Sequence, residues 1–147
     1  MAQQTKSLLN RKNTGFLLAK ALQRWNEQLY QGFCERGYAQ VRPSYGSVLV
    51  PLFEEDGLRI GELAKRSKLS KQTMTTMVRL LERDALIGRK TDVDDSRATR
   101  VFLTPLARRF RPIAEIVLAD LEGKARRLCS RSDFDVVRKW LGDFADS

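Results

Sequence analysis

The chain has 147 residues, 42% of them hydrophobic, which is enough for one domain of ordinary size with a buried core. Histidine is absent, and the two cysteines, Cys34 and Cys129, lie far apart. These facts exclude Ser-His-Asp and Cys-His catalysis, histidine-based metal sites and zinc ribbons, so we expect no enzyme, metal or cofactor. No apolar run approaches the roughly 18 residues of a membrane span, and the first residues lack the apolar stretch of a signal peptide. We therefore also expect a cytoplasmic location and no membrane partner.

Positive charge dominates the sequence, because 27 lysines and arginines against 18 acids give a net charge of +9. Residues 59–111 hold fourteen of the bases and six of the acids, so almost all of the excess lies in this segment. A basic surplus by itself favours solubility. Its concentration in one segment favours binding to a polyanion such as DNA.

Residues 1–12 are polar and basic without a periodic pattern, which predicts a flexible tail. A long helix is expected from Asn13 or Thr14 to about Gly37. Its apolar residues alternate four and three positions apart, at Leu18, Leu22, Trp25 and Leu29. This spacing suits packing against another helix, either of the same chain or of a second copy.

A second helix is expected from Pro43, because proline is favoured in the first helical turn. Pro51 within this helix removes a backbone donor and clashes with the preceding turn, which predicts a kink or an end near Val50. A short strand around residues 58–60 then leads to a helix over residues 60–66.

Residues 60–83 have the pattern of a helix-turn-helix unit. The turn at residues 67–69 leads to Ser70, a residue type that caps helix N-termini, and then to a helix over residues 71–83. The apolar stripe of this helix consists of Met74, Met77, Val78 and Leu81. The opposite face carries Gln72, Thr76, Arg79 and Arg83, with Thr73 and Thr75 at its flanks. A polar and basic face without acids is typical of recognition helices in the DNA major groove.

Two short strands, residues 87–91 and 98–103, follow this helix and predict a β-hairpin. The loop between them carries Asp92, Asp95 and Arg97. A hairpin directly after a recognition helix is a wing, and an arginine at its tip is long enough to enter the narrow minor groove.

The segment after the wing predicts two further helices. Thr104 is a capping residue and Pro105 suits the first turn of a long helix, whose apolar pattern continues to Leu128. Residues 132–135 resemble a capping box for a last helix. The apolar side of that helix consists of Phe134, Val137, Trp140, Leu141 and Phe144.

The segments ELAKRSKLS, T-x-T, LLERDALI, D-x-x-D-x-R and V-x-L-T follow one another in an order and spacing that resemble the MarR family of bacterial winged-helix regulators. The resemblance implies a mainly α fold with a small β-wing, in one domain over residues 13–147. A winged helix-turn-helix core over about residues 42–104 is then flanked by dimerisation arms over about 13–37 and 105–147. In the family the arms of two subunits interlock, so we expect a homodimer that binds double-stranded DNA at a rough inverted repeat.

The expected DNA contacts of the recognition helix come from Ser70, Lys71, Gln72, Thr73, Thr75, Thr76 and Arg79. Ser70 and Lys71 lie where backbone N–H groups favour a phosphate. Gln72 is suited to adenine and Arg79 to guanine, and the threonines are suited to thymine methyl groups or phosphates.

On the wing, Arg89, Lys90 and Arg100 are expected to contact the DNA backbone. The resemblance implies that Arg97 enters the minor groove and that Asp95 holds its guanidinium by an ion pair. The alternative is an exposed ion pair that only shapes the turn.

The resemblance also implies a response to a signal. Most family members are repressors that lose affinity for DNA when a small, often aromatic acid binds between the arms and the winged core, and others respond to thiol oxidation. The candidate pocket residues are Trp25, Tyr38, Tyr45 and Phe53, with Arg42 or Arg59 as the partner of an anion. The alternative is that these aromatic residues belong to the core. Cys34 is a candidate redox sensor, with an inert thiol as the alternative.

Several positions depart from the family pattern, among them three in or directly after the recognition helix. Thr76 replaces a frequent arginine and Arg79 a frequent acid, so the preferred DNA sequence cannot be transferred from relatives. Ala85 replaces the usual glycine after the recognition helix, which predicts that this helix ends without an easy left-handed residue.

Two other functions remain compatible with the sequence. One is an architectural DNA-binding protein with little sequence preference, and the other is a protein-interaction module on a degenerate winged helix. The intact polar face of the recognition helix and the arginine of the wing argue against the second.

Overall fold

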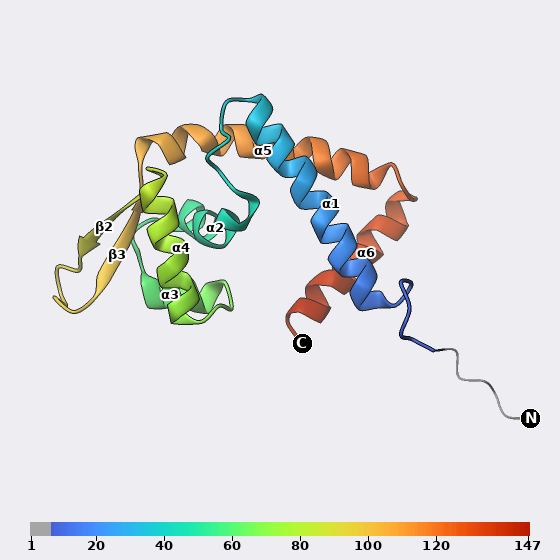
Figure 1. The fold of residues 1–147 in the computed structure, drawn as a ribbon, viewed down its shortest axis with the longest axis horizontal. Coiled ribbons are helices and arrows are strands. Elements are labelled where there is room, and N and C mark those ends of the chain that lie inside the picture. Colours follow the sequence, from blue (N-terminus) through green and yellow to red (C-terminus); the bar gives the residue numbers. More distant parts are fainter. Residues whose placement is uncertain (1–6) are drawn as a thin grey trace, which may run out of the picture.

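The computed structural model describes residues 7–147, whose helices and strands are drawn in Figure 1. In chain order they are α1 (Thr14–Glu35), the 3-10 turn η1 (Pro43–Tyr45), α2 (Gly46–Glu54), β1 (Leu58–Arg59), α3 (Ile60–Arg66), α4 (Lys71–Arg83), β2 (Ile87–Thr91), β3 (Thr99–Leu103), α5 (Pro105–Arg126) and α6 (Arg131–Ala145). None of the helices in this described part is long and apolar enough to cross a membrane. Of the tail expected over residues 1–12, residues 1–6 lie outside the described part, and turns occur within residues 7–12.

The elements form two regions (Figure 1). The winged core comprises η1, α2, β1, α3, α4, β2 and β3, and the arms comprise α1, α5 and α6. α5 starts beside the wing and extends away from the core, and α6 then turns back toward α1. The sequence prediction of a mainly α fold with a small wing between two helical arms is confirmed.

The wing belongs to a three-stranded antiparallel sheet in the order β1-β3-β2. β2 pairs with β3 along the whole of Ile87–Thr91. On the other edge of β3, β1 places Arg59 opposite Arg100. Because β1 leads directly into α3, this pairing ties the wing to the start of the helix-turn-helix unit.

Apolar side chains from α2, α3, α4, β3 and the turn before β2 fill the centre of the winged core. The fully buried ones are Val48, Leu52, Leu63, Met74, Val78, Leu81, Leu86 and Val101. Burying one such side chain stabilises a fold by about 1.5–3 kcal/mol relative to leaving it exposed. The helix-turn-helix unit is therefore held in shape by contacts within its own chain.

Pro51 lies inside α2, which continues to Glu54 instead of ending near Val50. That predicted end was wrong because another residue compensates for the missing hydrogen bond. Without an N–H at Pro51, the carbonyl of Ser47 loses its helical donor. The hydroxyl of Ser67, in the turn after α3, donates to this carbonyl at 2.5 Å. The same bond fixes the helix-turn-helix turn against α2.

Close packing between α1 and α5 holds the arms together. Gly32 is buried in α1, and a Cβ at this position would lie 2.5 Å from Cγ1 of Val117 in α5. The rings of Phe33 and Phe110 meet edge to face with their centroids 4.8 Å apart. The absence of a Cβ at Gly32 and the Phe33–Phe110 contact together determine how closely α1 and α5 approach each other.

The turn between α5 and α6 differs from the sequence prediction. α5 ends before Leu128, which is 88% exposed in this turn. The cap of α6 is Ser130 and not Ser132, because the hydroxyl of Ser130 accepts from the N–H of Asp133 at 3.2 Å. Both serines belong to capping residue types, so the local sequence alone did not distinguish them.

Candidate nucleic-acid interface

α4 separates an apolar face from a polar face, with the phase that the sequence predicted. Its buried residues are Met74, Val78 and Leu81. Its exposed residues include Gln72, Thr73, Thr76 and Arg79. Ser70 caps the helix, because its Oγ accepts from the N–H of Thr73 at 3.1 Å. The outward face thus offers amide, methyl and guanidinium groups, which suit the base edges and phosphates of a major groove.

The end of α4 is anchored to η1 by a partly buried hydrogen bond. Tyr45 is 3% exposed, and its hydroxyl donates to the carboxylate of Asp84, directly after α4, at 2.5 Å. Burial and the neighbouring carboxylate raise the pKa of Tyr45, and the donated hydrogen bond lowers the pKa of Asp84. Tyr45, a candidate pocket wall in the sequence, therefore lies in the core and positions the recognition helix.

Arg89 of β2 forms an ion pair with Glu82 of α4. Its Nε and Nη2 donate to the two carboxylate oxygens, each at 2.9 Å. The paired guanidinium lowers the pKa of Glu82. A contact of Arg89 with the DNA backbone must compete with this pair, which fixes the wing against α4. Lys90, the next residue, lies with its ammonium 5.2 Å from the ring centre of Phe102.

Asp92 organises the base of the wing loop. Among the described residues, it is the only charged one that is buried. Its carboxylate accepts from the N–H of Asp94 at 2.8 Å, from Nε of Arg59 at 2.8 Å and from Nε of Arg100 at 2.7 Å. The backbone hydrogen bond and the two guanidiniums lower the pKa of Asp92 to about 2. The carboxylate is therefore ionised throughout the neutral range and joins the loop to two strands.

This cluster changes the roles of two residues that the sequence placed elsewhere. Arg100, expected to contact DNA, also donates from Nη1 to the carbonyl of Gly57 at 2.8 Å, so its guanidinium is used within the fold. Arg59, a candidate partner of an anionic effector, holds Asp92 instead. The strand register, which only the structure shows, explains why an acid is found here. Arg59 and Arg100 face each other across β1 and β3, and only an acid can sit between two such cations at low cost.

Arg97 is exposed at the tip of the wing. Its side chain is 91% exposed, and the nearest carboxylate is that of Asp95, 3.4 Å from Nε. The same Asp95 oxygen accepts from the backbone N–H of Arg97 at 3.0 Å. The structure thus brings Asp95 and Arg97 together as the sequence predicted, with the carboxylate shaping the turn and the guanidinium projecting from it.

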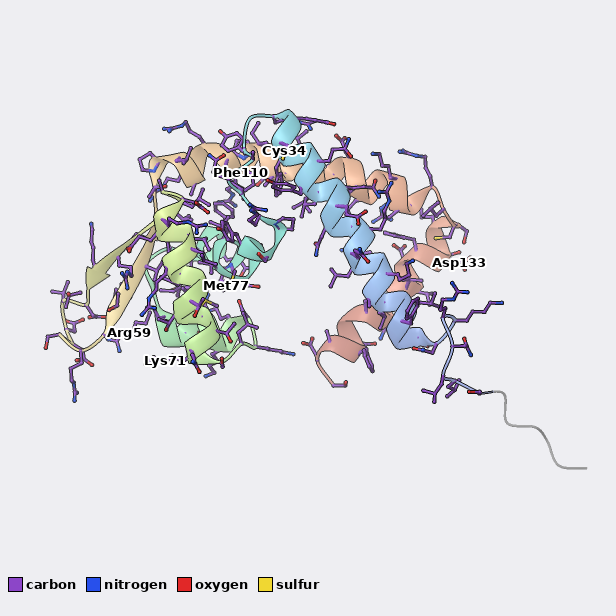
Figure 2. All side chains as sticks on the ribbon, viewed as in Figure 1. Cys34, Arg59, Lys71, Met77, Phe110 and Asp133 are labelled. Carbon is purple, nitrogen blue, oxygen red and sulfur yellow. The ribbon has the colours of Figure 1, made fainter. Side chains whose placement is uncertain are left out.

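A cleft separates the wing from the start of the helix-turn-helix unit. It is lined by Arg59, Gly61, Lys71, Asp95, Arg97 and Thr99, among others. Figure 2 shows Arg59 and Lys71 close together below the wing. The first residue of the recognition helix and the arginine of the wing therefore border the same cleft.

The candidate effector residues of the sequence do not line one pocket. Trp25 lines an apolar hollow between α1, α5 and α6, together with Phe134 and Leu141. Tyr38 packs against Phe110, with ring centroids 5.2 Å apart. These aromatic residues serve separate parts of the packing, which agrees with the alternative that they belong to the core.

Of the other candidates for signal binding, Arg42 and Cys34 both lie beside Tyr30, whereas Phe53 lies elsewhere. The guanidinium of Arg42 lies 5.4 Å from the ring centre of Tyr30. Phe53 lies at the same distance, 5.4 Å, beneath the guanidinium of Arg111. Cys34 is exposed near the end of α1 (Figure 2). None of these contacts joins the three candidates into one site within the described residues.

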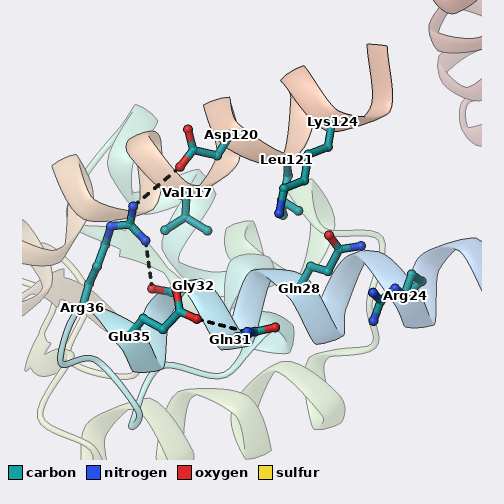
Figure 3. Close-up of a pocket in the computed structure, with 10 residues that line it drawn as sticks. All are labelled: Arg24, Gln28, Gln31, Gly32, Glu35, Arg36, Val117, Asp120, Leu121 and Lys124. Carbon is teal, nitrogen blue, oxygen red and sulfur yellow. Dashed lines mark hydrogen bonds and ion pairs between the residues drawn. The ribbon is translucent and has the colours of Figure 1, made fainter. Parts of the chain in front are cut away.

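A polar hollow lies between α1 and α5 (Figure 3). Its groups largely bond to one another: Arg36 pairs with Asp120 at 3.6 Å, and Gln31 donates to Glu35 at 3.0 Å. None of the candidate effector residues from the sequence lines this hollow.

The chain matches the sequence profile described as the MarR family over residues 43–99. This span contains the helix-turn-helix unit and the wing up to the start of β3. None of the curated proteins matches the chain with significance.

Solved structures share the whole fold at low sequence identity. A probable transcriptional regulator from Pseudomonas aeruginosa is 24% identical, with a TM-score of 0.79 over 90% of this chain and 97% of that chain. The repressor CouR of Rhodococcus jostii RHA1, solved on a 23-mer DNA duplex, is 23% identical, with a TM-score of 0.79 over 95% and 99%. The PcaV regulator of Streptomyces coelicolor, solved with its natural ligand, is 19% identical, with a TM-score of 0.78 over 97% and 99%.

The profile match covers the region in which α4 and the wing border one cleft, and the shared fold extends over both arms. Residues 43–99 of this chain thus match the MarR family, and the chain as a whole shares the fold of solved MarR regulators.

Proposed function

We propose that this regulator binds double-stranded DNA as a homodimer, recognises an inverted repeat by its sequence, and represses transcription until a signal releases it. Its partners are then DNA, a second copy of the chain and a small aromatic or anionic effector, and its place of action is the cytoplasm. The family consists of transcriptional regulators, so the chain acts by binding and not by catalysis.

One observation carries the DNA part of this proposal: Lys71 of α4 and Arg97 of the wing border the same cleft. A recognition helix and a wing arranged in this way can contact a major groove and the adjacent minor groove together. Cationic contacts to phosphates supply most of the affinity, and contacts to base edges supply the sequence preference. Arg97 suits the minor groove because its side chain is 91% exposed.

The homodimer is supported by apolar side chains that the arms leave exposed. Within the described chain, no residue of α6 is buried. Val136, Trp140 and Phe144 recur every four residues on one side of this helix, and all three are exposed. Exposed apolar patches of this kind mark interaction surfaces. A two-fold dimer presents two recognition helices about one DNA turn apart, so the half-sites lie about 10 bp apart.

The test of the DNA proposal is a selection of bound duplexes from random DNA, made with the natural chain, with Arg97→Ala and with Arg127→Ala. Arg127 follows α5 on the arms, so this control removes the same charge away from the wing. We expect the natural chain and Arg127→Ala to enrich an inverted repeat. Arg97→Ala is expected to bind it about ten- to a hundredfold more weakly, because a charge-assisted contact in the minor groove is lost.

Other results of this selection would overturn the proposal. Binding without an enriched sequence would favour an architectural DNA-binding protein. No binding at moderate salt, by a chain that is folded and dimeric, would favour a protein-interaction module. Equal losses for Arg97→Ala and Arg127→Ala would show that net charge, and not the wing, determines the affinity.

The response to an effector is supported by two similar structures. PcaV was solved with its natural ligand and CouR with p-coumaroyl-CoA. The test is to titrate aromatic carboxylates and their coenzyme A thioesters against the operator complex. The proposal is supported by a compound that binds the free protein and lowers its operator affinity as the fraction of protein holding the compound rises. Constant operator affinity across both series would argue against this class of effector.

A further inference from the structure

We infer that Thr76 recognises a thymine in each half-site through its methyl group and not through its hydroxyl. The inference rests on the proposed function and deepens it, because it assigns a specificity-determining group in the middle of α4. Thr76 is exposed on the outward face, one helical turn after Gln72.

The hydroxyl of Thr76 already has a partner within the helix. Its Oγ1 donates to the carbonyl of Gln72 at 3.2 Å. This backward bond from residue i to residue i−4 is one that threonine readily makes in helices. The other branch on the threonine Cβ is a methyl group. With the hydroxyl turned to the helix backbone, the methyl group is the part that remains to face outward.

The neighbouring hydroxyl groups are used in the same way. Thr75 donates to the carbonyl of Lys71 at 2.8 Å. Ser70 donates to Oγ1 of Thr73 at 2.8 Å while its own Oγ caps the helix. A phosphate or base that needed a hydroxyl donor from these residues would have to break a bond inside the helix. The free polar donors of this face are therefore the amide of Gln72, the guanidinium of Arg79 and, on its flank, the hydroxyl of Thr73, which accepts from Ser70 and keeps its own proton.

Thymine offers the group that a free methyl can recognise. Its C5 methyl is the apolar group of the major groove, and a threonine methyl is one of its usual contacts. Gln72 lies one turn away from Thr76 and is suited to adenine, so the two side chains together favour neighbouring A·T pairs. Phosphates are bound more favourably by the charge of Lys71 and by the N–H groups at the start of α4. Gln72 and Thr76 are therefore left to contact bases.

The experiment uses the operator found by selection and replaces its thymines with uracil one position at a time. Uracil pairs like thymine but lacks the C5 methyl group. For the natural chain, we expect one position in each half-site at which this change weakens binding about three- to tenfold, the effect of removing one buried methyl contact. Substitution at the remaining positions should leave the affinity nearly unchanged.

Two variants separate the methyl group from the hydroxyl. Thr76→Ser keeps the hydroxyl and removes the methyl group, so it should show the same loss on unmodified DNA and no sensitivity to uracil at that position. Thr76→Val keeps a methyl group and removes the hydroxyl, so it should retain both the affinity and the sensitivity. Thr14→Ser is the matched control, since Thr14 is exposed at the start of α1 in the arms, outside the expected DNA contacts, and this variant should keep the sensitivity. Circular dichroism confirms that the variants are folded.

The outcomes distinguish this inference from the function on which it rests. A chain that enriches no sequence overturns the proposed function. An enriched operator without a uracil-sensitive thymine overturns only the inference. The inference also fails if Thr76→Val loses affinity while Thr76→Ser does not, because the hydroxyl is then the group in contact. Equal uracil sensitivity in Thr76→Ser and the natural chain would assign the thymine to another residue.

Discussion

The winged core and the arms differ in how far each buries its apolar residues. In the core, side chains such as Leu63 and Val78 are completely buried. In α6, Val136, Trp140 and Phe144 are 67%, 43% and 60% exposed. Each square ångström of apolar surface left in water costs about 25 cal/mol. The core therefore buries its apolar residues within one chain, whereas the arms leave apolar surface of α6 in water.

The two regions also use charge differently. In the core, Asp92 is buried between two arginines and fixes the wing loop. In the arms, pairs such as Arg126 with Asp135, at 3.6 Å, lie on the surface. Exposed pairs of this kind contribute about 0–1 kcal/mol. The ion pairs of the buried Asp92 thus fix the shape of the wing loop, whereas exposed ion pairs of the arms add little to stability.

A polar contact joins the end of α6 to the core. The ammonium of Lys68, in the turn between α3 and α4, donates to the carbonyl of Ala145 at 2.8 Å and to Asp146 at 3.0 Å. The turn that leads into the recognition helix is therefore in contact with the far end of the arms. Both side chains are largely exposed, so this contact adds only weakly to the connection that α5 makes between the arms and the core.

The largest effect is expected from breaking the exposed apolar face of α6. Trp140 stacks on Phe144, with ring centroids 5.1 Å apart, and both belong to this face. Trp140→Glu should raise the dissociation constant of the dimer by about 30-fold or more, because aromatic residues at the centre of interfaces contribute about 2 kcal/mol or more. Operator affinity should fall with it, since a monomer contacts one half-site. Analytical ultracentrifugation measures the first effect and a binding titration the second.

A control for Trp140→Glu is Val93→Glu in the wing loop. Val93 is 98% exposed, so the control places the same charge on an exposed apolar residue of the core. It should leave the dimer unchanged. A dimer that survives Trp140→Glu, or dissociates equally in both variants, would contradict an interface on this side of α6.

A smaller effect is expected from Asp92→Asn, which keeps the size of the side chain and removes its charge. Arg59 and Arg100 then lose their common partner, and the loop that carries Arg97 becomes less ordered. Operator affinity should fall roughly three- to tenfold, because binding must then order the loop. Asp94→Asn is the control, since Asp94 is exposed in the same loop. Equal losses in the two variants would assign the effect to loop charge and not to the buried cluster.

Asp92 also predicts a dependence of stability on pH. The pKa of an aspartate is about 3.9 in an unfolded chain, and that of Asp92 in the fold is about 2. Because the folded value is the lower one, the ionised carboxylate stabilises the fold fully above about pH 4, and this contribution is lost as the pH falls toward about 2. In urea unfolding, Asp92→Asn should therefore lose less stability than the natural chain between these two pH values.

The sequence predicted the features that depend on local pattern. The periodicity of Met74, Val78 and Leu81 gave the buried face of α4, and Ser70 gave its start. The wing could be placed because its two strands are adjacent in the sequence and separated by a short loop. Such features need only neighbouring residues, so they were visible before the fold was known.

The features that the sequence did not predict depend on contacts between distant residues. The hydroxyl of Ser67, in the turn after α3, supplies the hydrogen bond that Pro51 of α2 cannot donate. The hydrogen bond from Tyr45 to Asp84 spans 39 positions. Arg89 looked like a DNA contact because its partner Glu82 lies on a different element. The sequence could not predict which way the aromatic candidates for an effector pocket point. In the fold, these side chains lie in separate places.

The smallest effect is expected at Ala85, which follows α4 in the core and can be compared directly with Gly37, which follows α1 in the arms. Ala85 has a φ of +61° directly after Asp84, the C-terminal cap of α4, so the helix ends in a left-handed residue that does not adopt this conformation easily. The hydrogen bonds of this turn explain the conformation, because the N–H of Leu86 donates to the carbonyl of Leu81 at 2.9 Å. α1 ends in the same way, but with glycine, since Gly37 has a φ of +87°. The core thus tolerates a strained alanine where the arms use the residue that adopts this conformation freely.

Ala85→Gly should relieve that strain and raise the free energy of unfolding by about 0.5–1 kcal/mol, because a left-handed alanine costs about 1–2 kcal/mol and the freer unfolded glycine offsets part of the gain. The reverse change at the end of α1, Gly37→Ala, should lower it by about 1 kcal/mol, because no atom lies within 4 Å of the added Cβ and only the backbone conformation opposes it. Urea titrations measure both as shifts of the midpoint at constant slope. A lower midpoint for Ala85→Gly would mean that the methyl group of Ala85 contributes more through packing than its backbone costs in strain.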